Sequence, residues 1–412
     1  MKLKRHLEFL KAVFIYTITS FGGAQGHMAM MLKTFVEERK DITEKELIEY
    51  NAFCQMLPGA SSSQTITLIG YKRGGIFLSV LTLITWILPA CFFMGLLSFL
   101  IDYFDTGVLQ TKEVFKYVKP MAIGFIAYSA FNLYKISVNN TITKVILAVS
   151  ILLTFLLFKS PWIFPSVIVA GGIATNFSKK RIPQREEPPK KVSWGNLVIF
   201  FALFFITAIL SETARKDNWQ GRPKFNLIEN CYRFGSLTFG GGDVLAPIMY
   251  EQYVVRPQTP RILEKNNNVL SMKKDDFLTG YGILKAIPGP TFSLSSFVGG
   301  RVLKKYGTTS QVWGCIIGTV AIFLPSTLLV LFFFPVWNNL KKYAVIYRSL
   351  EGINAAVVGI IFASSLYLLK DISIDVSDGK IEHFINIITI AGTFCLLKFT
   401  KLRPPYIVLM CL

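Results

Sequence analysis

The sequence predicts an all-α, polytopic membrane protein built from two inverted, homologous halves with broken or re-entrant helices. Hydrophobic residues make up 52% of the 412 residues and charged residues 17%, and the mean hydropathy is +0.47, which is too apolar for a soluble chain. Apolar runs long enough for a hydrocarbon core of about 30 Å recur along the chain. Motifs of the first half also return in the second half, which indicates a duplicated unit.

The basic residues predict topology. The formal net charge is +19, but Lys and Arg stand in short connections between apolar runs, so no nucleic-acid partner is predicted. The basic connections fall on one predicted side of the bilayer, which is therefore cytoplasmic. They are residues 1–6, Lys72 with Arg73, the linker 178–191 and residues 341–348. The acidic connection 371–382 falls on the other side.

Cysteines and the N-terminus point to structural roles. The six cysteines are scattered, form no CxxC pair and mostly lie in apolar segments, so we expect buried small side chains and neither metal ligands nor disulfides. No metal and no cofactor are predicted. Residues 1–22 have the basic start and apolar run of a secretory signal, but a similar stretch recurs mid-chain, so we treat them as part of the fold.

Apolar segments predict the helices of the first half, and the second half repeats most of them. They are 7–21, 51–69, 76–101, 119–136, 143–158 and 162–177. We divide the chain into a first repeat (1–177), a basic linker with one extra helix at 193–210 (178–212), and a second repeat (213–412). An odd number of crossings turns the second copy upside down, as in many secondary transporters. The first segment, which contains Glu8 and Lys11, and the short last one, 404–412, could each be re-entrant or interfacial.

Four motifs recur in the same order in both halves. SFGG at Ser20 returns as TFGG at Thr238, and LPGASSSQ returns as IPGPTFSL. Two weaker echoes are ITWILPA with VAIFLPS and AIGFIAYSAF with VVGIIFASSL. The aligned pairs are Gly22 with Gly240, Gly23 with Gly241, Pro58 with Pro288, Gly59 with Gly289, Pro89 with Pro325, and Gly124 with Gly359.

Each Pro-Gly pair stands in the middle of an apolar run, where the helix should break. Proline lacks a donor and glycine frees the backbone, and at membrane depth a break is tolerated only inside protein or beside a cavity. Hydroxyl side chains follow each break and can cap the new helix start. They are Ser61, Ser62, Ser63 and Thr65 in one half and Thr291, Ser293, Ser295 and Ser296 in the other.

A helix start presents free N–H groups and about half a positive charge, so it attracts anions. Two starts aimed at one point would supply roughly half of what a tetrahedral dianion needs, and a cation or a co-bound proton would supply the rest. Lys285, aligned with Gln55, is placed for this role, whereas Arg73 and Arg301 fit an entrance better. The predicted substrate-binding residues are Gly22, Gly23, Gln55, Pro58, Gly59, Ser61, Ser62, Ser63, Gly240, Gly241, Lys285, Pro288, Gly289, Thr291 and Ser293.

Each of these features also has a structural interpretation. Pro-Gly can kink a helix for packing, with serines satisfying the loose carbonyls. The FGG glycines could bring backbone close to an ion or allow tight helix packing. His27 could titrate near neutral pH in a proton relay or be a structural histidine. Asp243 and Glu351 could carry protons or mark an interface.

These motifs resemble the chromate ion transporter family, in its long form with two homologous halves. The matching elements are FGGAQGHMAMM, CQMLPGASSSQ, GYKRGG, LTFGGGDVLAP and AIPGPTFSLSSFVGG. The resemblance implies a multi-pass protein of the bacterial cytoplasmic membrane that exports chromate, with sulfate as a competitor. Protons as coupling ion and a homodimer fit this expectation. Two departures, Lys285 and the polar insertion 253–276, leave another oxyanion such as sulfate open as substrate.

Two rival functions fit the residues less well. PGASSSQT also resembles the PGxSRS-type loop of undecaprenyl-pyrophosphate phosphatases, which are membrane enzymes. That loop needs an arginine where Ser62 stands, and no paired glutamates lie nearby for general base catalysis. A sensor or scaffold would use the polar connections, which hold no recognisable domain. The sequence therefore predicts a transporter and no enzyme.

Overall fold

The structure is a computed structural model that describes residues 2–105, 115–160, 162–176, 194–239, 241–264, 269–337, 344–373 and 380–412. Every regular element within these residues is helical, which confirms the all-α prediction. Five helical segments are long and apolar enough to cross a membrane, which makes the chain a multi-pass membrane protein. They are Ser61–Ile101, Gly195–Lys216, Thr308–Phe333, Arg348–Lys370 and Glu382–Phe399.

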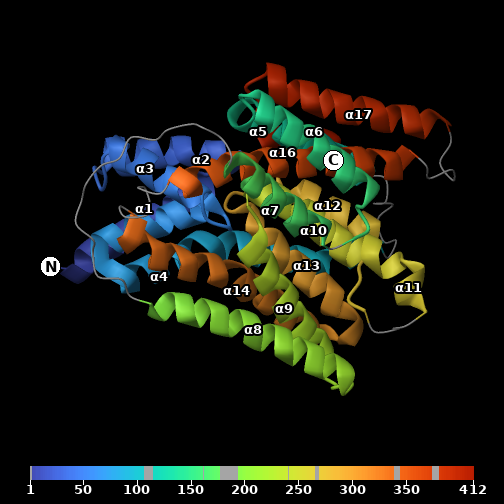
Figure 1. The fold of residues 1–412 in the computed structure, drawn as a ribbon, viewed down its shortest axis with the longest axis horizontal. Coiled ribbons are helices and arrows are strands. Elements are labelled where there is room, and N and C mark those ends of the chain that lie inside the picture. Colours follow the sequence, from blue (N-terminus) through green and yellow to red (C-terminus); the bar gives the residue numbers. More distant parts are fainter. Residues whose placement is uncertain are drawn as a thin grey trace. The chain divides into compact units, whose positions relative to one another are not determined.

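The helices follow the same order in both halves (Figure 1). The first half contains α1 (Lys2–Thr19), α2 (Gly23–Met31), a π-helical segment (Leu32–Glu38), α3 (Glu44–Gln55), α4 (Ser61–Asp105), α5 (Val118–Ser137), α6 (Thr141–Leu156) and α7 (Ile163–Asn176). The second half contains α9 (Arg222–Leu237), α10 (Gly242–Tyr250), a π-helical segment (Glu251–Val255), α11 (Pro260–Leu263), α12 (Lys274–Leu284), α13 (Leu294–Leu303), α14 (Thr308–Phe333), α16 (Ala344–Ser373), α17 (Lys380–Phe399) and α18 (Pro404–Cys411). Helix α8 (Gly195–Lys216) stands between the two sets.

The predicted segments of the first half each overlap helices of the structure. The segment 51–69 is divided between the end of α3 and the start of α4, and the predicted extra helix at 193–210 is α8. The linker 178–191 lies outside the described residues. Helix α18 comprises the eight residues Pro404–Cys411, about 12 Å of helix.

Helix α4 is a hairpin of two arms. Gly74 and Gly75 interrupt it, and Gly75 has a φ of 69° that suits glycine. Trp86 Nε1 donates to the Ser63 hydroxyl (2.9 Å) and Ser79 Oγ to the Thr67 carbonyl (3.0 Å), contacts that require antiparallel arms. The first arm, 61–73, is about 20 Å long, so it is too short to cross the hydrocarbon core and must be re-entrant.

Helices α13 and α14 repeat this hairpin in the second half. A methyl group on Gly299 of α13 would stand 2.2 Å from the Gly314 carbonyl oxygen of α14. One on Gly318 of α14 would stand 2.1 Å from the Ser295 carbonyl oxygen of α13. The two helices therefore pack backbone to backbone, as small residues allow in membranes. Each half thus contains a broken helix followed by a short arm, a turn and a long arm.

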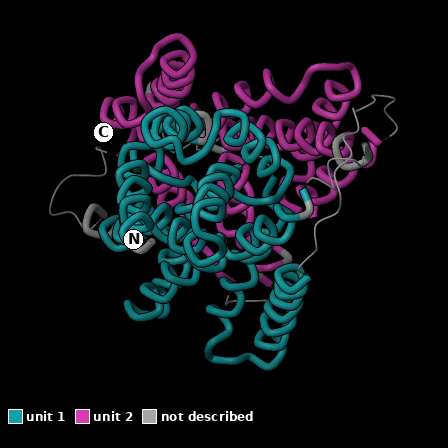
Figure 2. The backbone as a smooth tube through the Cα atoms, turned by 90° about the vertical axis from the view of Figure 1, so that its left-hand side faces the viewer, with its two compact units in different colours: residues 1–102, 190–242, 284–337 teal, residues 103–189, 243–283, 338–412 magenta. Residues whose placement is uncertain are grey.

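The chain divides into two compact units, and each unit draws helices from both halves (Figure 2). Unit 1 comprises residues 1–102, 190–242 and 284–337, and unit 2 comprises residues 103–189, 243–283 and 338–412. Within unit 1, α14 packs against α8, α9 and α13. The units follow packing, whereas the predicted boundaries at 177 and 212 describe the repeats and remain a prediction.

The two repeats interlock reciprocally within unit 2. Helix α16 packs on α6 and α7, and its aligned partner α5 packs on α17 and α18. A methyl group on Gly124 of α5 would lie 2.8 Å from Thr393 Cβ of α17, and one on Gly359 of α16 would lie 2.5 Å from Ser150 Cβ of α6. Each repeat thus packs one helix on helices of the other repeat, as expected for two copies related by a two-fold axis. The extra helix α8 between the repeats gives an odd number of crossings, which predicts that the second copy is inverted.

Candidate functional site

Both predicted helix breaks are present at the Pro-Gly pairs. Helix α3 ends at Gln55 and α4 begins at Ser61, and after α12 ends at Leu284 a 3-10 turn at 291–293 leads into α13. Gly59 and Gly289 have nearly the same φ, 118° and 116°, in a region that residues with a side chain rarely adopt. The two breaks therefore share one backbone geometry.

Each break is hydrogen-bonded to the other repeat, inside unit 1. The Gly59 N–H donates to the Thr238 carbonyl (2.7 Å), and the Gly289 N–H donates to the Ser20 carbonyl (3.1 Å). Ser20 and Thr238 are aligned positions that precede the FGG motifs. The exchange is therefore reciprocal, and it ties the two recurring motifs of the sequence to each other.

Side-chain packing at the breaks is reciprocal as well. A methyl group on Gly59 would lie 2.3 Å from Ser326 Cβ, and one on Gly289 would lie 2.8 Å from Ala90 Cβ. Ala90 and Ser326 follow the aligned prolines of α4 and α14. Each break thus fits against the long arm of the other repeat, and it leaves no room for a larger residue than glycine.

The long arm of α4 contacts residues at both breaks. Trp86 bonds Ser63, the third residue after the first break, and Ala90 contacts Gly289 of the second. Residues 86 and 90 are separated by about 6 Å of helix. Residues of both breaks therefore pack against the same stretch of the α4 long arm.

The helix start after the first break leaves amide groups without a helical acceptor. The first intrahelical bond of α4 runs from the Gln64 N–H to the Ala60 carbonyl (3.0 Å). The N–H groups of Ser61, Ser62 and Ser63 precede it, so no carbonyl of the helix accepts from them. In the second repeat the Ser293 N–H donates to the Pro290 carbonyl (3.0 Å), so fewer amides are left over there.

The hydroxyl groups do not cap these helix starts, contrary to the sequence-based prediction. Thr65 donates to the Ser61 carbonyl and Ser295 to the Phe292 carbonyl, both at 2.8 Å. Neither the turn at 291–293 nor α13 has a side-chain cap. Hydroxyls in helices commonly bond back to a carbonyl of the preceding turn, and this competes with capping. The amides of the helix starts consequently remain available to another acceptor.

Four buried polar atoms around the breaks have no hydrogen-bond partner among the described residues. They are Ser20 Oγ, Gln64 Oε1, Thr238 Oγ1 and Ser293 Oγ. Tyr16 lies near Ser20, but its hydroxyl donates to the His27 carbonyl (3.2 Å). Buried polar groups are normally paired, so these four atoms are hydrogen-bonding capacity that the described residues leave unused.

A polar and aromatic cluster surrounds the first break. His27 is buried, and its Nδ1 lies 3.1 Å from Ser62 Oγ. Its ring meets Trp86 edge-on at 5.1 Å, and Trp86 stacks on Tyr16 at 4.9 Å. Sequence reasoning placed His27 among the relay candidates but missed Tyr16 and Trp86. The signal was available, because the aligned positions in the second repeat hold Phe234 and Ile322.

The FGG motifs form the turns that start α2 and α10. Gly22, Gly23 and Gly241 have φ values of 92°, 67° and 89°, and no atom lies within 4 Å of a methyl group placed on Gly23 or Gly241. Backbone conformation, and not tight packing, therefore requires glycine at these two positions. Gly240 lies outside the described residues.

Arg73 and Arg301 lie near the ends of their short arms that point away from the breaks in sequence. Arg73 lies at the tip of the α4 hairpin and pairs with the buried Asp41 (3.3 Å), and Arg301 donates to the Ser98 carbonyl (3.3 Å). Asp243, in unit 2, accepts a hydrogen bond from Tyr281 (3.4 Å). A separate role for Arg73 and Arg301 at an entrance stays a prediction.

The aligned residues before the two breaks differ in charge and in exposure. Gln55 is the last residue of α3 and is exposed, whereas Lys285 is half-buried in the turn after α12. Pro58 and Pro288 lie in the non-helical segments that follow, and the Pro58 carbonyl accepts from Gln64 Nε2 (2.8 Å). At this aligned position the first break thus has a neutral residue and the second a cation.

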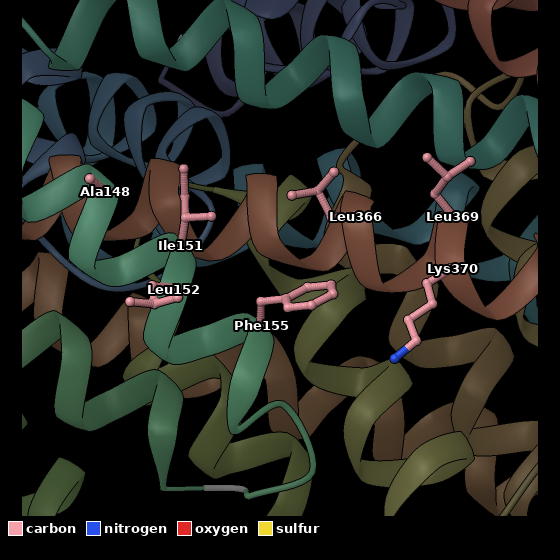
Figure 3. A pocket seen from close by; sticks show the side chains of 7 residues that line it. All are labelled: Ala148, Ile151, Leu152, Phe155, Leu366, Leu369 and Lys370. Carbon is pink, nitrogen blue, oxygen red and sulfur yellow. The ribbon is translucent and has the colours of Figure 1, made fainter.

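An open pocket in unit 2 has the wrong chemistry for an oxyanion (Figure 3). Its volume is about 400 Å³, and it is lined by Ala148, Ile151, Leu152, Phe155, Leu366, Leu369 and Lys370. The Lys370 ammonium reaches toward the Phe155 ring and lies 5.9 Å from its centre. No hydroxyl lines this pocket. The described residues also contain no group of His, Cys, Asp or Glu that could hold a metal ion.

The family model described as chromate transporter matches residues 7–176 and 225–412. The chain belongs to the chromate transporter family. Its relatives include a chromate transport protein of Cupriavidus metallidurans, 25% identical, with 94% of this chain and 87% of that protein covered. An uncharacterized transporter of Methanocaldococcus jannaschii is 26% identical (89% and 85% covered), and a chromate transport protein of Pseudomonas aeruginosa is 24% identical (88% and 80% covered). No solved structure matches the chain.

Membership of the chromate transporter family agrees with the repeats seen in the structure. The two matches fall on the two helix sets, and α8 lies in the gap between them. The matches contain both Pro-Gly breaks and both FGG motifs. The family is one of transporters, so these shared elements belong to a transport protein.

Proposed function

We propose that this chain exports chromate across the bacterial cytoplasmic membrane and holds the anion where the two helix breaks of unit 1 meet. The observation that carries the proposal is the pair of breaks that pack on one arm of α4. Among the described residues, the amides of Ser61 to Ser63 have no helical acceptor and three buried hydroxyls near the breaks have no partner. A tetrahedral oxyanion offers only acceptor oxygens, so N–H and O–H donors in a dry region suit it.

The electrostatics favour a dianion that brings a compensating positive charge. Two helix starts supply about one unit of positive charge, which leaves roughly one unit of a dianion uncompensated. Lys285 at the second break, or a proton bound with the anion, supplies the remainder in this proposal. Protons are accordingly the proposed coupling ion, and the functional form is proposed to be a homodimer.

The names of the Cupriavidus and Pseudomonas relatives support chromate as substrate. Sulfate has the same shape and charge, so a sulfate carrier is the second candidate. The N–H and O–H donors at the breaks recognise the shape and charge of an anion. Chromate and sulfate share both properties. Substrate preference therefore has to be measured.

Transport into proteoliposomes tests the proposal. We expect uptake of labelled chromate in competition with sulfate, weaker uptake of phosphate and molybdate, and a response to an imposed pH gradient. Replacing Ser61 and Thr291 together with alanine should weaken chromate binding several-fold, because each removes a hydroxyl donor at a helix start. Thr389→Ala, in α17 of unit 2, is the matched control, since the Thr389 hydroxyl only bonds within its own helix.

Two outcomes would count against the proposal. Absence of uptake for all four oxyanions would contradict the transport function. Uptake with an unchanged affinity in the Ser61 and Thr291 double variant would contradict the site and leave the function standing.

A further inference from the structure

We propose that His27 makes oxyanion binding proton-linked: the protonated imidazole donates to the Ser62 hydroxyl, which then donates to the anion. The inference rests on the proposed function, since it needs an anion at the α4 helix start. It goes further by naming the group that takes up the proton and the atom through which the proton acts.

The His27 side chain lies next to the start of helix α4. Its side chain is 2% exposed, and Nδ1 lies 3.1 Å from Oγ of Ser62, the second residue of α4. Trp86 packs edge-on against the ring, and the Tyr16 hydroxyl holds the His27 carbonyl. The two arms of α4 thus contact the imidazole, and α1 bonds the backbone of His27.

The second repeat shows that packing does not require this cluster. The positions aligned with His27, Ser62 and Trp86 are Leu245, Phe292 and Ile322. The second hairpin nevertheless forms the same break, turn and long arm, with a matching Gly289 conformation. Apolar residues therefore satisfy the fold at these positions, so the polar set of the first repeat needs another explanation.

Protonation of His27 determines which way the Ser62 hydroxyl points. Both nitrogens of an imidazolium are donors, so Nδ1–H must donate to Ser62 Oγ and the Ser62 hydrogen is free for an acceptor oxygen of the anion. When Nδ1 instead carries the lone pair, Ser62 donates to the ring and turns its own lone pairs toward the anion. One proton taken up from solution therefore converts a repelling oxygen into a donor.

The positive charge of a protonated His27 equals the part of a dianion's charge that the two helix starts leave uncompensated. Two starts provide about one positive charge, and one protonated histidine provides the second that a dianion needs. The Ser62 hydroxyl and the Trp86 ring, both of α4, contact the His27 ring, and neither carries a charge at neutral pH. Release of the proton and release of the anion are then linked.

Equilibrium binding and proton uptake by the purified full-length protein test this inference. Chromate and sulfate binding are measured from about pH 6 to about pH 8, across the usual histidine range. Sulfate remains a dianion throughout, so its pH dependence reports the protein. The parent should bind both anions about tenfold more tightly at the acidic end and take up about one proton per anion.

Variants assign the effect to His27. His27→Gln should bind weakly, with no pH dependence and no proton uptake, whereas His383→Gln, in α17 of unit 2, should match the parent. Ser62→Ala should weaken binding and keep part of the pH dependence, because the imidazolium charge remains. This second variant provides a measurement should His27→Gln fail to fold.

The outcomes separate the two proposals. Parental pH dependence and proton uptake in His27→Gln, or parental affinity in Ser62→Ala, would overturn the role of His27. A parent protein that binds neither anion at any pH contradicts the proposed function itself.

Discussion

The two helix breaks of unit 1 have the same backbone and different side chains. Gly59 and Gly289 share their φ values, their reciprocal amide bonds and their fit against the other repeat's long arm. Five of the surrounding side chains carry a polar group in the first repeat and are apolar in the second. The aligned pairs are Tyr16 with Phe234, His27 with Leu245, Ser62 with Phe292, Gln64 with Leu294, and Trp86 with Ile322.

This difference separates what the fold requires from what the site requires. Backbone geometry that both repeats share is required by the fold, because the two repeats could not form their reciprocal contacts without it. Chemistry present in one repeat only is not needed for folding. The backbone is alike at both breaks, so a pocket between them can bind a symmetric anion. The polar side chains surround only the first break, so the protonation site can lie on that side.

Alanine at either glycine should give the largest effect and should affect both breaks alike. Gly59→Ala and Gly289→Ala each place a methyl group on a strained backbone and against Ser326 or Ala90. We expect a loss on the order of 4 kcal/mol, enough to abolish a monodisperse protein in detergent. Gel filtration and thermal unfolding of the purified variants measure this.

Gly195→Ala provides the control, because a methyl group at Gly195 meets no atom within 4 Å. Its unfolding temperature should equal that of the parent. A folded Gly59→Ala protein beside an unfolded Gly289→Ala protein would show that the two breaks are not equivalent.

Trp86→Ile tests the divergent side chains by giving the first repeat the residue of the second. The change removes the hydrogen bond to Ser63 and the stack on Tyr16, and it leaves unfilled space beside His27. We expect a loss of about 2 kcal/mol in stability, measured as a lower unfolding temperature. Chromate affinity should fall as well, since the His27 ring loses its support.

The reverse change, Ile322→Trp, enlarges a fully buried residue of α14 and should destabilise the protein through overpacking. If Trp86→Ile is as stable as the parent and binds chromate equally well, the cluster has no role in holding the first break.

The sequence was sufficient to predict the breaks, because Pro-Gly in an apolar run has few physical outcomes. It also predicted the duplication and the helix α8, which depend on local pattern. It could not predict that the Gly59 amide bonds the carbonyl of Thr238, because that contact joins residues far apart in the chain. For the same reason the interlocked units were not foreseen, and their boundaries differ from those of the repeats.

Only part of the candidate site could be predicted from the sequence alone. Hydroxyls after a break predict a cap, but here they bond back to the preceding turn, a choice that depends on local geometry. The sequence left His27 with a functional and a structural interpretation, and it could not predict the contacts of His27 with Ser62 and Trp86. Comparing aligned positions of the two repeats for polarity would have identified the cluster.

Lys285→Gln gives the smallest expected effect and removes the charge difference between the aligned residues Gln55 and Lys285. It makes the second approach match Gln55 of the first. Since Lys285 is half-buried and the anion is also compensated by two helix starts, we expect about a fivefold loss of chromate affinity, or about 1 kcal/mol. The loss should shrink at high salt, because screening weakens charge interactions.

Gln55→Lys is the matched variant, and its effect should be smaller, since Gln55 is exposed and solvent screens an added charge there. Binding isotherms for both variants and the parent at two salt concentrations measure the difference. An affinity for Lys285→Gln equal to the parent's at low salt would remove Lys285 from the site. The charge that completes the dianion's compensation would then have to come from the bound proton, which makes the His27 measurement the decisive one.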